Sequence, residues 1–487
     1  MSAPAPPPAG TSLAAIAQAV RSGHTTALAL VEETFARIAA LDASLHAFCT
    51  LDPDGAYAAA ERIDQRVLRN EPVGPLAGVP VAVKDLICTR GLRTTFGSRL
   101  YANHVPDEDD VVVERLRHAG AIIVGKTNTS EFGYGAFGHN AVFPTTRNPW
   151  NLDLTPGGSS AGSGAAVAAN LVPLAIGSDG GGSVRAPAAL CGIYGIKPSM
   201  GRVPAYPGCR DERYPGVSSW ESLEHIGPMT RTVADAALAL SVLAGPTPKD
   251  RFSLPCDIRD WGVRPAETLR GVRIAFSPDL GFAAVEPEVR AIVQAAVVRL
   301  EGALGCSVDM AHPEIGGYAE AFETLVAMDT DRRGLRRMAT EQGIALEGWL
   351  ASLVDRDWSA DEFTDAVFER KRIVNATWRF MERYDFLVTP TTACAAFPLN
   401  VPGPDTIDGQ AVAAGSAWLA FSALGNLTGA PTASVPVGLT RDGRPVGLQI
   451  MGRHLDDLGV LALSSAVEAL YPRVGPGLAC SRKWIAD

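Results

Sequence analysis

The chain lacks the signatures of several protein classes. Its 487 residues include eight cysteines, but none forms a C-x-x-C pair, so the usual spacing of zinc and thioredoxin-type redox sites is missing. No stretch of about eighteen uninterrupted apolar residues occurs, so we expect no membrane span. Acidic side chains outnumber basic ones by 53 to 43, which leaves no basic footprint for nucleic acid or for an anionic membrane surface.

The cysteines and the first residues indicate a compartment. The cysteines are scattered singly, which is typical of free thiols in a reducing environment. They are Cys49, Cys88, Cys191, Cys209, Cys256, Cys306, Cys394 and Cys480. The segment MSAPAPPPAGTS has neither a cationic stretch nor an apolar run and is therefore not expected to be a secretory signal. We expect residues 1–10, rich in proline and alanine, to be disordered, and the protein to be cytoplasmic.

What the chain does contain is typical of a globular enzyme with a large core, because 47% of its residues are apolar and 20% are charged. Apolar runs predict strands at 79–84 and 121–125, with a helix at 110–117 between them. This alternation predicts an α/β fold with a largely parallel sheet. A capping box at Ser359–Glu362 lies in a helical, charge-rich cover at about 315–385. Because no linker or repeat is evident, we expect one domain from 11 to 487, with its core at about 75–205.

Lys84 stands at the end of the first predicted strand, Val79-Pro-Val-Ala-Val-Lys. Burial there would penalise the charged ammonium and lower the pKa of Lys84 toward that of a neutral amine, which can act as a general base. The alternative is a lysine that pairs with Asp85 or reaches the surface. Taken alone, the position favours this alternative.

Two clusters of glycine and serine follow: Thr155-Pro-Gly-Gly-Ser-Ser-Ala-Gly-Ser-Gly and Ser178-Asp-Gly-Gly-Gly-Ser-Val-Arg. In the second, three glycines before Ser183 allow several backbone N–H groups to converge on one point, as a developing oxyanion requires. Simpler explanations are a helix N-cap for the first cluster and a phosphate-binding loop for the second. However, the G-x-x-x-x-G-K-[ST] pattern of a phosphate loop is absent.

The two clusters together resemble the amidase signature. The similarity extends over almost the whole chain, through Gly78-Val-Pro-Val-Ala-Val-Lys-Asp, Gly125-Lys-Thr-Asn, Asn148-Pro-Trp-Asn, Asn426-Leu-Thr-Gly-Ala-Pro and Pro445-Val-Gly-Leu-Gln-Ile. The resemblance implies the amidase signature fold, an α/β fold with a large twisted, mixed but mostly parallel sheet between helical layers. It also implies a Ser–cis-Ser–Lys triad. Ser183 would be the nucleophile, Ser159 the bridging serine after a cis peptide bond from Gly158, and Lys84 the base.

The same resemblance assigns supporting roles and an activity. The backbone N–H groups of Gly180, Gly181, Gly182 and Ser183 would form the oxyanion hole, with Ser160 and Arg185 as supporting polar residues and Asp179 as the partner of Arg185. The implied reaction is hydrolysis of small aryl or alkyl amides through an acyl-enzyme, with possible activity on esters and carbamates. Segments 132–139, 205–220 and 315–380 would build the substrate pockets. No cofactor or metal is implied, and a homodimer is compatible with the sequence.

Two other assignments stay open. Gly158-Ser-Ser-Ala-Gly162 also fits the G-x-S-x-G motif of α/β-hydrolases, which would make Ser160 the nucleophile and require a histidine such as His225, His312 or His454. Alternatively, the chain resembles the A subunit of glutamyl-tRNA amidotransferase, which works within a complex. Two features depart from that protein: the stretch 206–220, and glycine at 180, where it usually has threonine.

Overall fold

The computed structural model describes residues 10–255, 260–399, 401–413 and 415–476. The prediction of disorder at 1–10 falls almost entirely outside these ranges, and so do Cys256 and Cys480. The other six cysteines are free thiols, and all of them except Cys49 are buried. No helix in the described ranges is both long and apolar enough to cross a membrane.

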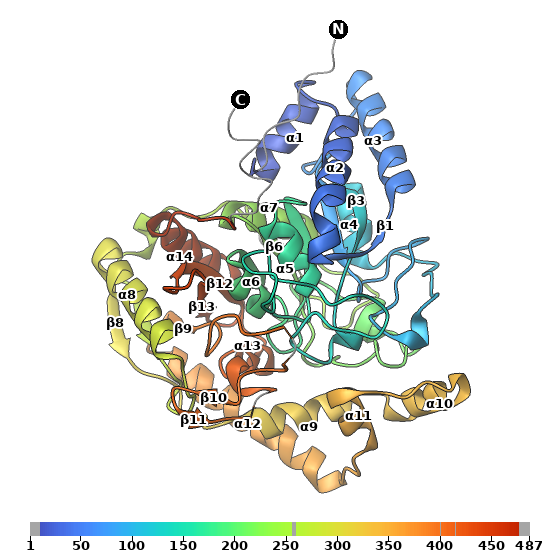
Figure 1. Cartoon of the computed structure of the whole chain (residues 1–487). Coiled ribbons are helices and arrows are strands. Elements are labelled where there is room, and N and C mark those ends of the chain that lie inside the picture. The colour runs from blue at the N-terminus through green and yellow to red at the C-terminus, as the bar shows by residue number, and fades with distance from the viewer. Residues whose placement is uncertain (1–9, 256–259, 400, 414, 477–487) are drawn as a thin grey trace.

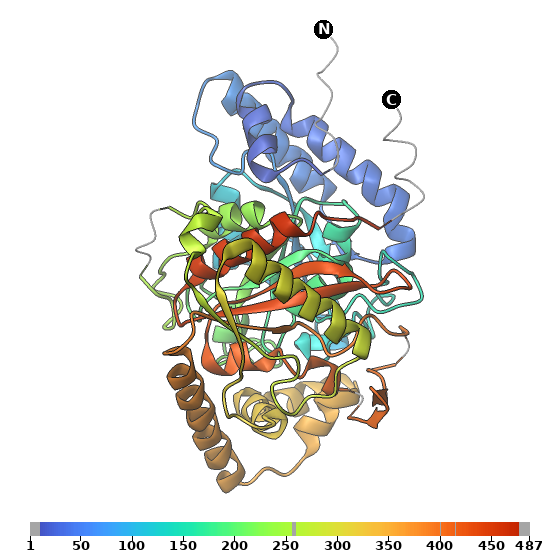
Figure 2. The same cartoon turned by 90° about the vertical axis from the view of Figure 1, so that its left-hand side faces the viewer.

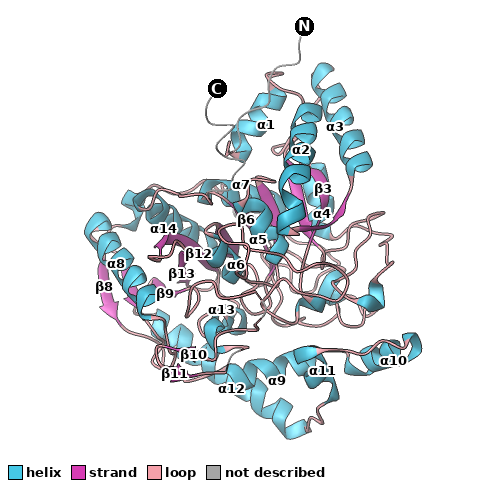
Figure 3. Ribbon diagram, viewed as in Figure 1, coloured by secondary structure: helices cyan, strands magenta, loops and turns pink. Residues whose placement is uncertain are grey.

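One large sheet runs through the middle of the described chain (Figures 1 and 3). It has eleven strands in the order β1-β3-β2-β4-β6-β5-β12-β13-β9-β7-β8. Their bounds are β1 Phe48–Leu51, β2 Pro80–Lys84, β3 Ile122–Thr127, β4 Leu174–Ser178, β5 Tyr194–Lys197, β6 Ile226–Thr230, β7 Arg273–Phe276, β8 Ser307–Met310, β9 Phe386–Pro390, β12 Thr432–Leu439 and β13 Pro445–Gly452. Two short strands, β10 Thr406–Ile407 and β11 Gln410–Ala411, pair separately.

The sheet is mixed, as predicted. Parallel pairs occur in two blocks, β3-β2-β4 and β9-β7-β8, whereas β1-β3 and the whole centre from β4 to β9 are antiparallel. Parallel pairing is thus less extensive than the alternation of strand and helix predicts. The reason lies in short connections such as the one between β12 and β13, which join neighbouring antiparallel strands directly.

Helices cover the sheet on both faces (Figure 2). The helices outside the site region are α1 Leu13–Arg21, α2 Ala27–Leu45, α3 Pro53–Leu68, α4 Val111–His118, α7 Val233–Leu243, α8 Pro287–Leu304, α9 Ala319–Asp329, α10 Arg332–Gln342, α11 Gly348–Asp355, α12 Ala360–Met381 and α14 Asp457–Leu470. The capping box of α12 is confirmed, with Ser359 Oγ accepting from Glu362 N. Trp378 on the same helix is 48% exposed.

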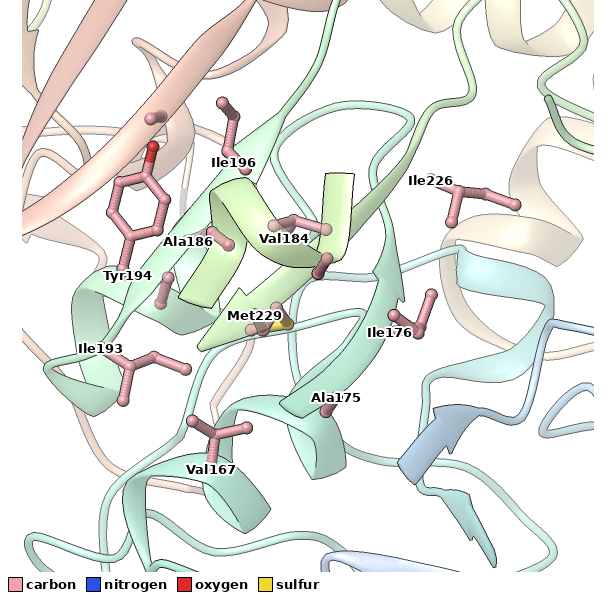
Figure 4. Packing of buried hydrophobic residues seen from close by; sticks show 14 of the residues in the cluster. Val167, Ala175, Ile176, Val184, Ala186, Ile193, Tyr194, Ile196, Ile226 and Met229 are labelled. Atoms are coloured by element: carbon pink, nitrogen blue, oxygen red, sulfur yellow. The ribbon is translucent and has the colours of Figure 1, made fainter. Parts of the chain in front are cut away.

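Three short helices lie close to the two glycine-serine clusters: α5 Ala161–Ala168, α6 Arg185–Cys191 and α13 Ala423–Thr428. Every residue of α5 is buried, because its small side chains let it pack tightly against α6 and β4. Figure 4 shows part of this core, in which Val167 of α5, Ile176 of β4, Val184 and Met229 of β6 are among the buried side chains. This packing supports the two segments that contain the glycine-serine clusters.

Candidate active site

Sheet register brings the two motif regions together. β2 runs parallel to β4, with Val83 opposite Ile176, so Lys84 and Ser178 end neighbouring strands at the same edge. Loops that follow the carboxyl ends of parallel strands are the usual place for ligand sites in α/β folds. Here the glycine-rich loop 179–182 leaves that edge directly after Ser178.

The Lys84 side chain is completely buried and has three polar contacts. Its Nζ lies 2.7 Å from Ser159 Oγ, 2.9 Å from Ser178 Oγ and 3.3 Å from the Ser178 carbonyl oxygen. Desolvation lowers the pKa of Lys84 to about 8, although Glu224 and Asp179 oppose this shift. With that pKa, roughly a tenth of the Lys84 side chains are neutral at pH 7 and about half at pH 8, and the neutral amine is the form that can act as a general base.

Ser159 lies just before α5, and the Gly158–Ser159 peptide bond is cis, as the resemblance implies. The two preceding glycines are needed at this bend. Gly157 has a φ of 75°, and a Cβ on Gly158 would lie 2.7 Å from the backbone nitrogen of Phe137. The backbone therefore fixes Ser159 where its hydroxyl meets Lys84.

Ser183 lies between the glycine loop and α6. Its side chain is partly buried and lines the same cavity as Ser159. Within the described ranges its hydroxyl has no hydrogen-bond partner, so the Ser159 and Ser183 side chains share a cavity without a direct hydrogen bond. Catalytic hydrogen bonds are often loose before substrate binds, so this geometry is compatible with a nucleophile.

The backbone segment before Ser183 lines the cavity through Gly180 and Gly181. The N–H groups of Gly180, Gly181 and Ser183 have no acceptor among the described residues. Gly182 corrects the sequence prediction, because its N–H donates to Asp179 Oδ1 at 2.7 Å and is not free for an oxyanion. Three of the four predicted donors therefore lack an internal acceptor, and their role in an oxyanion hole stays a prediction.

A buried ion pair, whose polar groups are all hydrogen-bonded, supports the glycine-rich loop 179–182 on the side away from Lys84. Arg185 donates to both carboxylate oxygens of Asp179, each at 2.9 Å, and to Asn426 Oδ1 at 2.7 Å in α13. Burial opposes ionisation of Asp179, but Arg185 holds the pKa of this carboxyl well below its usual range. Ser422 adds a hydrogen bond of 2.7 Å to the Gly181 carbonyl oxygen. We call Asp179, Arg185, Asn426 and Ser422 the loop clamp.

Comparisons with known proteins identify the family of the chain. The amidase family model matches residues 29–461. The chain belongs to the amidase family. It is 36% identical over 476 residues to the A subunit of the glutamyl-tRNA(Gln) amidotransferase of Chloroflexus aurantiacus, covering 93% of this chain and 95% of that protein. It is 35% identical over 478 residues to an acylamidase of Rhodococcus erythropolis, covering 94% of each.

Similarity to a solved structure identifies the fold of the chain. A bacterial aryl acylamidase of the amidase signature family superposes with a TM-score of 0.86 and 30% identity over 98% of each chain. The amidase signature fold predicted from the sequence is therefore confirmed. The protein is an amidase, a hydrolase that acts on amides.

The amidase site does not have the features of an α/β-hydrolase. Ser160 is fully buried, and its hydroxyl both donates to the Ser178 carbonyl and accepts from the Ser178 N–H. Of the candidate histidines, His225 bonds the carbonyl of Leu223, His312 bonds that of Pro313, and His454 is exposed. Ser160 is thus a structural support at the base of the site.

Several residues of the amidase cavity are not evident from the sequence. Ser178 and Glu224 contribute polar groups, whereas Leu86, Phe132 and Trp220 line an apolar wall. Segments 132–139 and 205–220, predicted to build the pockets, each contribute lining residues. Ser178 could have been identified, since it opens the second motif. Phe132 and Trp220 lie within those two predicted segments, whereas Glu224 carries no local signal, because only the fold brings it to the loop.

Proposed function

We propose that this amidase hydrolyses small aryl and alkyl amides through an acyl-enzyme on Ser183, and that esters and carbamates are further substrates. The observation that carries the proposal is the 2.7 Å contact between the buried Lys84 Nζ and Ser159 Oγ, in the wall of a cavity that Ser183 also lines. A cytoplasmic location and a homodimer remain predictions from the sequence.

The proposed reaction begins with neutral Lys84. The amine takes the proton of Ser159, and Ser159 takes the proton of Ser183 as the Ser183 oxygen bonds to the substrate carbonyl carbon. The N–H groups of Gly180, Gly181 and Ser183 stabilise the resulting oxyanion. The proton then returns through Ser159 to the leaving nitrogen, the C–N bond breaks, and an ester on Ser183 remains.

Water completes the cycle. The same relay accepts a proton from water as the water oxygen attacks the ester carbon, and it returns the proton to Ser183 as the acid leaves. A carbamate or an ester offers an equivalent carbonyl carbon and an equivalent oxyanion, so the mechanism applies to both without any change in the residues.

Aromatic side chains around the glycine loop support a preference for apolar or aryl substrates. Trp220 lies against Gly180, and Phe322 of α9 lies against Gly181, where an added Cβ would be 2.8 and 2.5 Å away, respectively. Tyr134 and Trp349 continue this aromatic group around Trp220. Rings of this kind favour flat apolar groups over charged ones.

A substrate panel tests the proposal. Purified protein should hydrolyse p-nitroanilides, anilides, aryl esters and aryl carbamates, and Ser183→Ala should show no turnover above the buffer rate. Lys84→Met should fail in the same way. Substantial turnover by Ser183→Ala, or no hydrolysis of any substrate of the panel, would refute the proposal.

A second candidate is the A subunit of a glutamyl-tRNA amidotransferase, favoured by the 36% identity to such a protein. The environment of Gly180 argues against it, because a Cβ there would lie 2.8 Å from Trp220 and 2.9 Å from Glu224 Oε2. A threonine at 180, the residue expected there in that protein, does not fit between them. Activity restricted to glutamine in the presence of tRNA and the rest of such a complex would decide for this candidate.

A further inference from the structure

A second cavity adjoins the amidase cavity, and we call it the side chamber. Five residues line both of them: Leu86, Phe132, Ser178, Trp220 and Glu224. Behind this shared wall, the side chamber extends to the mostly apolar residues Ile87, Ala205, Gly208, Cys209, Val217 and Ile226. It therefore lies next to the cavity of Ser159 and Ser183, where it can hold a part of the substrate beyond the reacting carbonyl.

Asp110 also lines the side chamber and has one carboxylate oxygen without a partner. It is the N-cap residue of α4, and its Oδ1 accepts a hydrogen bond of 3.0 Å from the Val112 N–H. The other oxygen, Oδ2, lies beside Gly208, 3.8 Å from the place that a Cβ there would take. No donor among the described residues bonds Oδ2, although Asp110 is only 1% exposed. Because buried acceptors are normally hydrogen-bonded, we expect a molecule in the chamber to supply the donor.

The charges around the side chamber favour one kind of donor. Two acids, Asp110 and Glu224, are among the described residues that line it, and no lysine, arginine or histidine is. Glu224 lies on the shared wall, where its Oε2 would be 2.9 Å from a Cβ on Gly180. An amino group suits these surroundings, because it has N–H donors and, when protonated, the opposite charge. An apolar group would instead displace water from Asp110 and leave its oxygen unpaired.

We propose that the side chamber binds an amino group of the substrate and that Asp110 determines this preference. The inference rests on the proposed function and narrows its substrates to small aryl or alkyl amides that carry an amino group away from the reacting carbonyl. Such a preference is strong, because a site built around a hydrogen bond discriminates against an analogue that lacks the donor. Phe132 and Trp220, on the shared wall, flank the apolar or aryl part that joins the two groups.

The ionisation of Asp110 sets the conditions for a test. Burial raises the pKa of Asp110 to about 8, although the hydrogen bond from Val112 and the charge of Lys126 oppose this shift. Lys126 is not among the residues that line the chamber, and its Nζ donates to the Ile87 carbonyl oxygen. At pH 9 the Asp110 carboxyl is therefore mostly ionised and can only accept hydrogen bonds. Lys84, whose pKa is also about 8, is mostly neutral at that pH.

The test compares amides that differ only in an amino or a methyl group, which are similar in size. One pair, 4-aminoacetanilide and 4-methylacetanilide, varies the leaving group, and the other, 4-aminobenzamide and 4-methylbenzamide, varies the acyl group. The ratio of kcat/KM within each pair is measured at pH 9 for the native protein and for Asp110→Asn. Asparagine retains the cap of α4 through its Oδ1, so it presents N–H groups to the chamber in place of an acceptor.

In the pair whose amino group enters the chamber, Asp110→Asn should lower the ratio of the amino to the methyl substrate by about tenfold or more. This is the usual effect of one hydrogen bond to a charged group. The intrinsic reactivities of the substrates cancel in the comparison, because they are the same for both proteins. Asp110→Ser also retains an N-cap but has no second oxygen, so it should lower the same ratio and replaces Asp110→Asn if that variant fails to fold.

The matched control is Asp109→Asn, which makes the same replacement at the neighbouring residue. The Asp109 carboxylate bonds the Arg90 N–H and pairs with Arg117, and it is not among the residues that line the chamber, so both ratios should stay native. Native ratios in both pairs for the folded Asp110 variant would overturn the inference, and so would an equal loss in Asp109→Asn. Activity surviving in Ser183→Ala would instead refute the proposed function.

Discussion

The polar side chains on the two faces of the segment 178–180 differ in their hydrogen bonding, and this difference explains why one face supports the loop and the other faces the cavity. On one face, Asp179 is bonded by Arg185, Asn426 and the Gly182 N–H, so every strong acceptor direction is used. On the other face, the hydroxyls of Ser159 and Ser178 form a chain with Lys84 that leads to a cavity. A saturated network fixes geometry, whereas a chain with exchangeable donors can move a proton.

Because side chains alternate along the chain, the neighbouring residues Ser178 and Asp179 point to opposite faces. Asp179 supports the loop, whereas Ser178 contacts Lys84. Substitutions in the loop clamp should mainly reduce stability, and substitutions on the cavity face should mainly reduce the rate.

The largest effect is expected on the cavity face. Lys84→Met preserves most of the side-chain volume but removes the base, so kcat/KM should fall by about 10⁴-fold or more, as for other members of catalytic units. Steady-state kinetics on an anilide provide the measurement. Chemical denaturation should show that Lys84→Met is at least as stable as the native protein, because a buried amine is replaced by an apolar group.

On the clamp face, Arg185→Met leaves the Asp179 carboxylate buried without its cation. The free energy of unfolding should fall by about 3–5 kcal/mol, the usual cost of breaking a buried pair. Urea unfolding followed by circular dichroism provides the measurement. The matched control is Arg251→Met, which removes an arginine that is paired at the surface and should change stability by less than about 1 kcal/mol. Equal effects of the two substitutions would contradict the role of the clamp.

The native pH profile should reflect Lys84. Its pKa is about 8, and only the neutral amine can accept a proton, so kcat/KM should rise with pH and level off above that value. Below it, the rate should fall by about tenfold per pH unit, because each unit reduces the neutral fraction tenfold. A rate that is flat from pH 6 to pH 9 would mean that a different group is the base.

Among the residues of the loop clamp, the smallest effect is expected for Ser422. Ser422→Ala removes the 2.7 Å hydrogen bond to the Gly181 carbonyl, which should cost about 0.5–1.5 kcal/mol of stability. Because this bond orients a loop whose N–H groups face the cavity, kcat should fall more than KM changes. Thermal unfolding and steady-state kinetics on the same preparation would show both. A change in KM alone would place Ser422 in substrate binding.

The sequence predicted the parts of the site that lie in contiguous motifs. Lys84, Ser159 and Ser183 all stand in runs with recognisable neighbours, and the Lys84–Ser159 contact is present in the fold. Gly182 was assigned wrongly, because a motif shows that an N–H is present but not which acceptor uses it. Glu224, which lines the cavity, was missed because strand register between segments some 45 residues apart brings it there, and the local sequence carries no signal for that register.

Peptide mass spectrometry of the trapped intermediate tests the central claim most directly. The protein is mixed with a p-nitrophenyl ester at pH 8, quenched in acid within the first turnovers, and digested. We predict the added acyl mass on the peptide that contains Ser183, and its absence in Ser183→Ala. An acyl group on Ser160, or turnover with no acylated peptide at any quench time, would contradict an acyl-enzyme on Ser183.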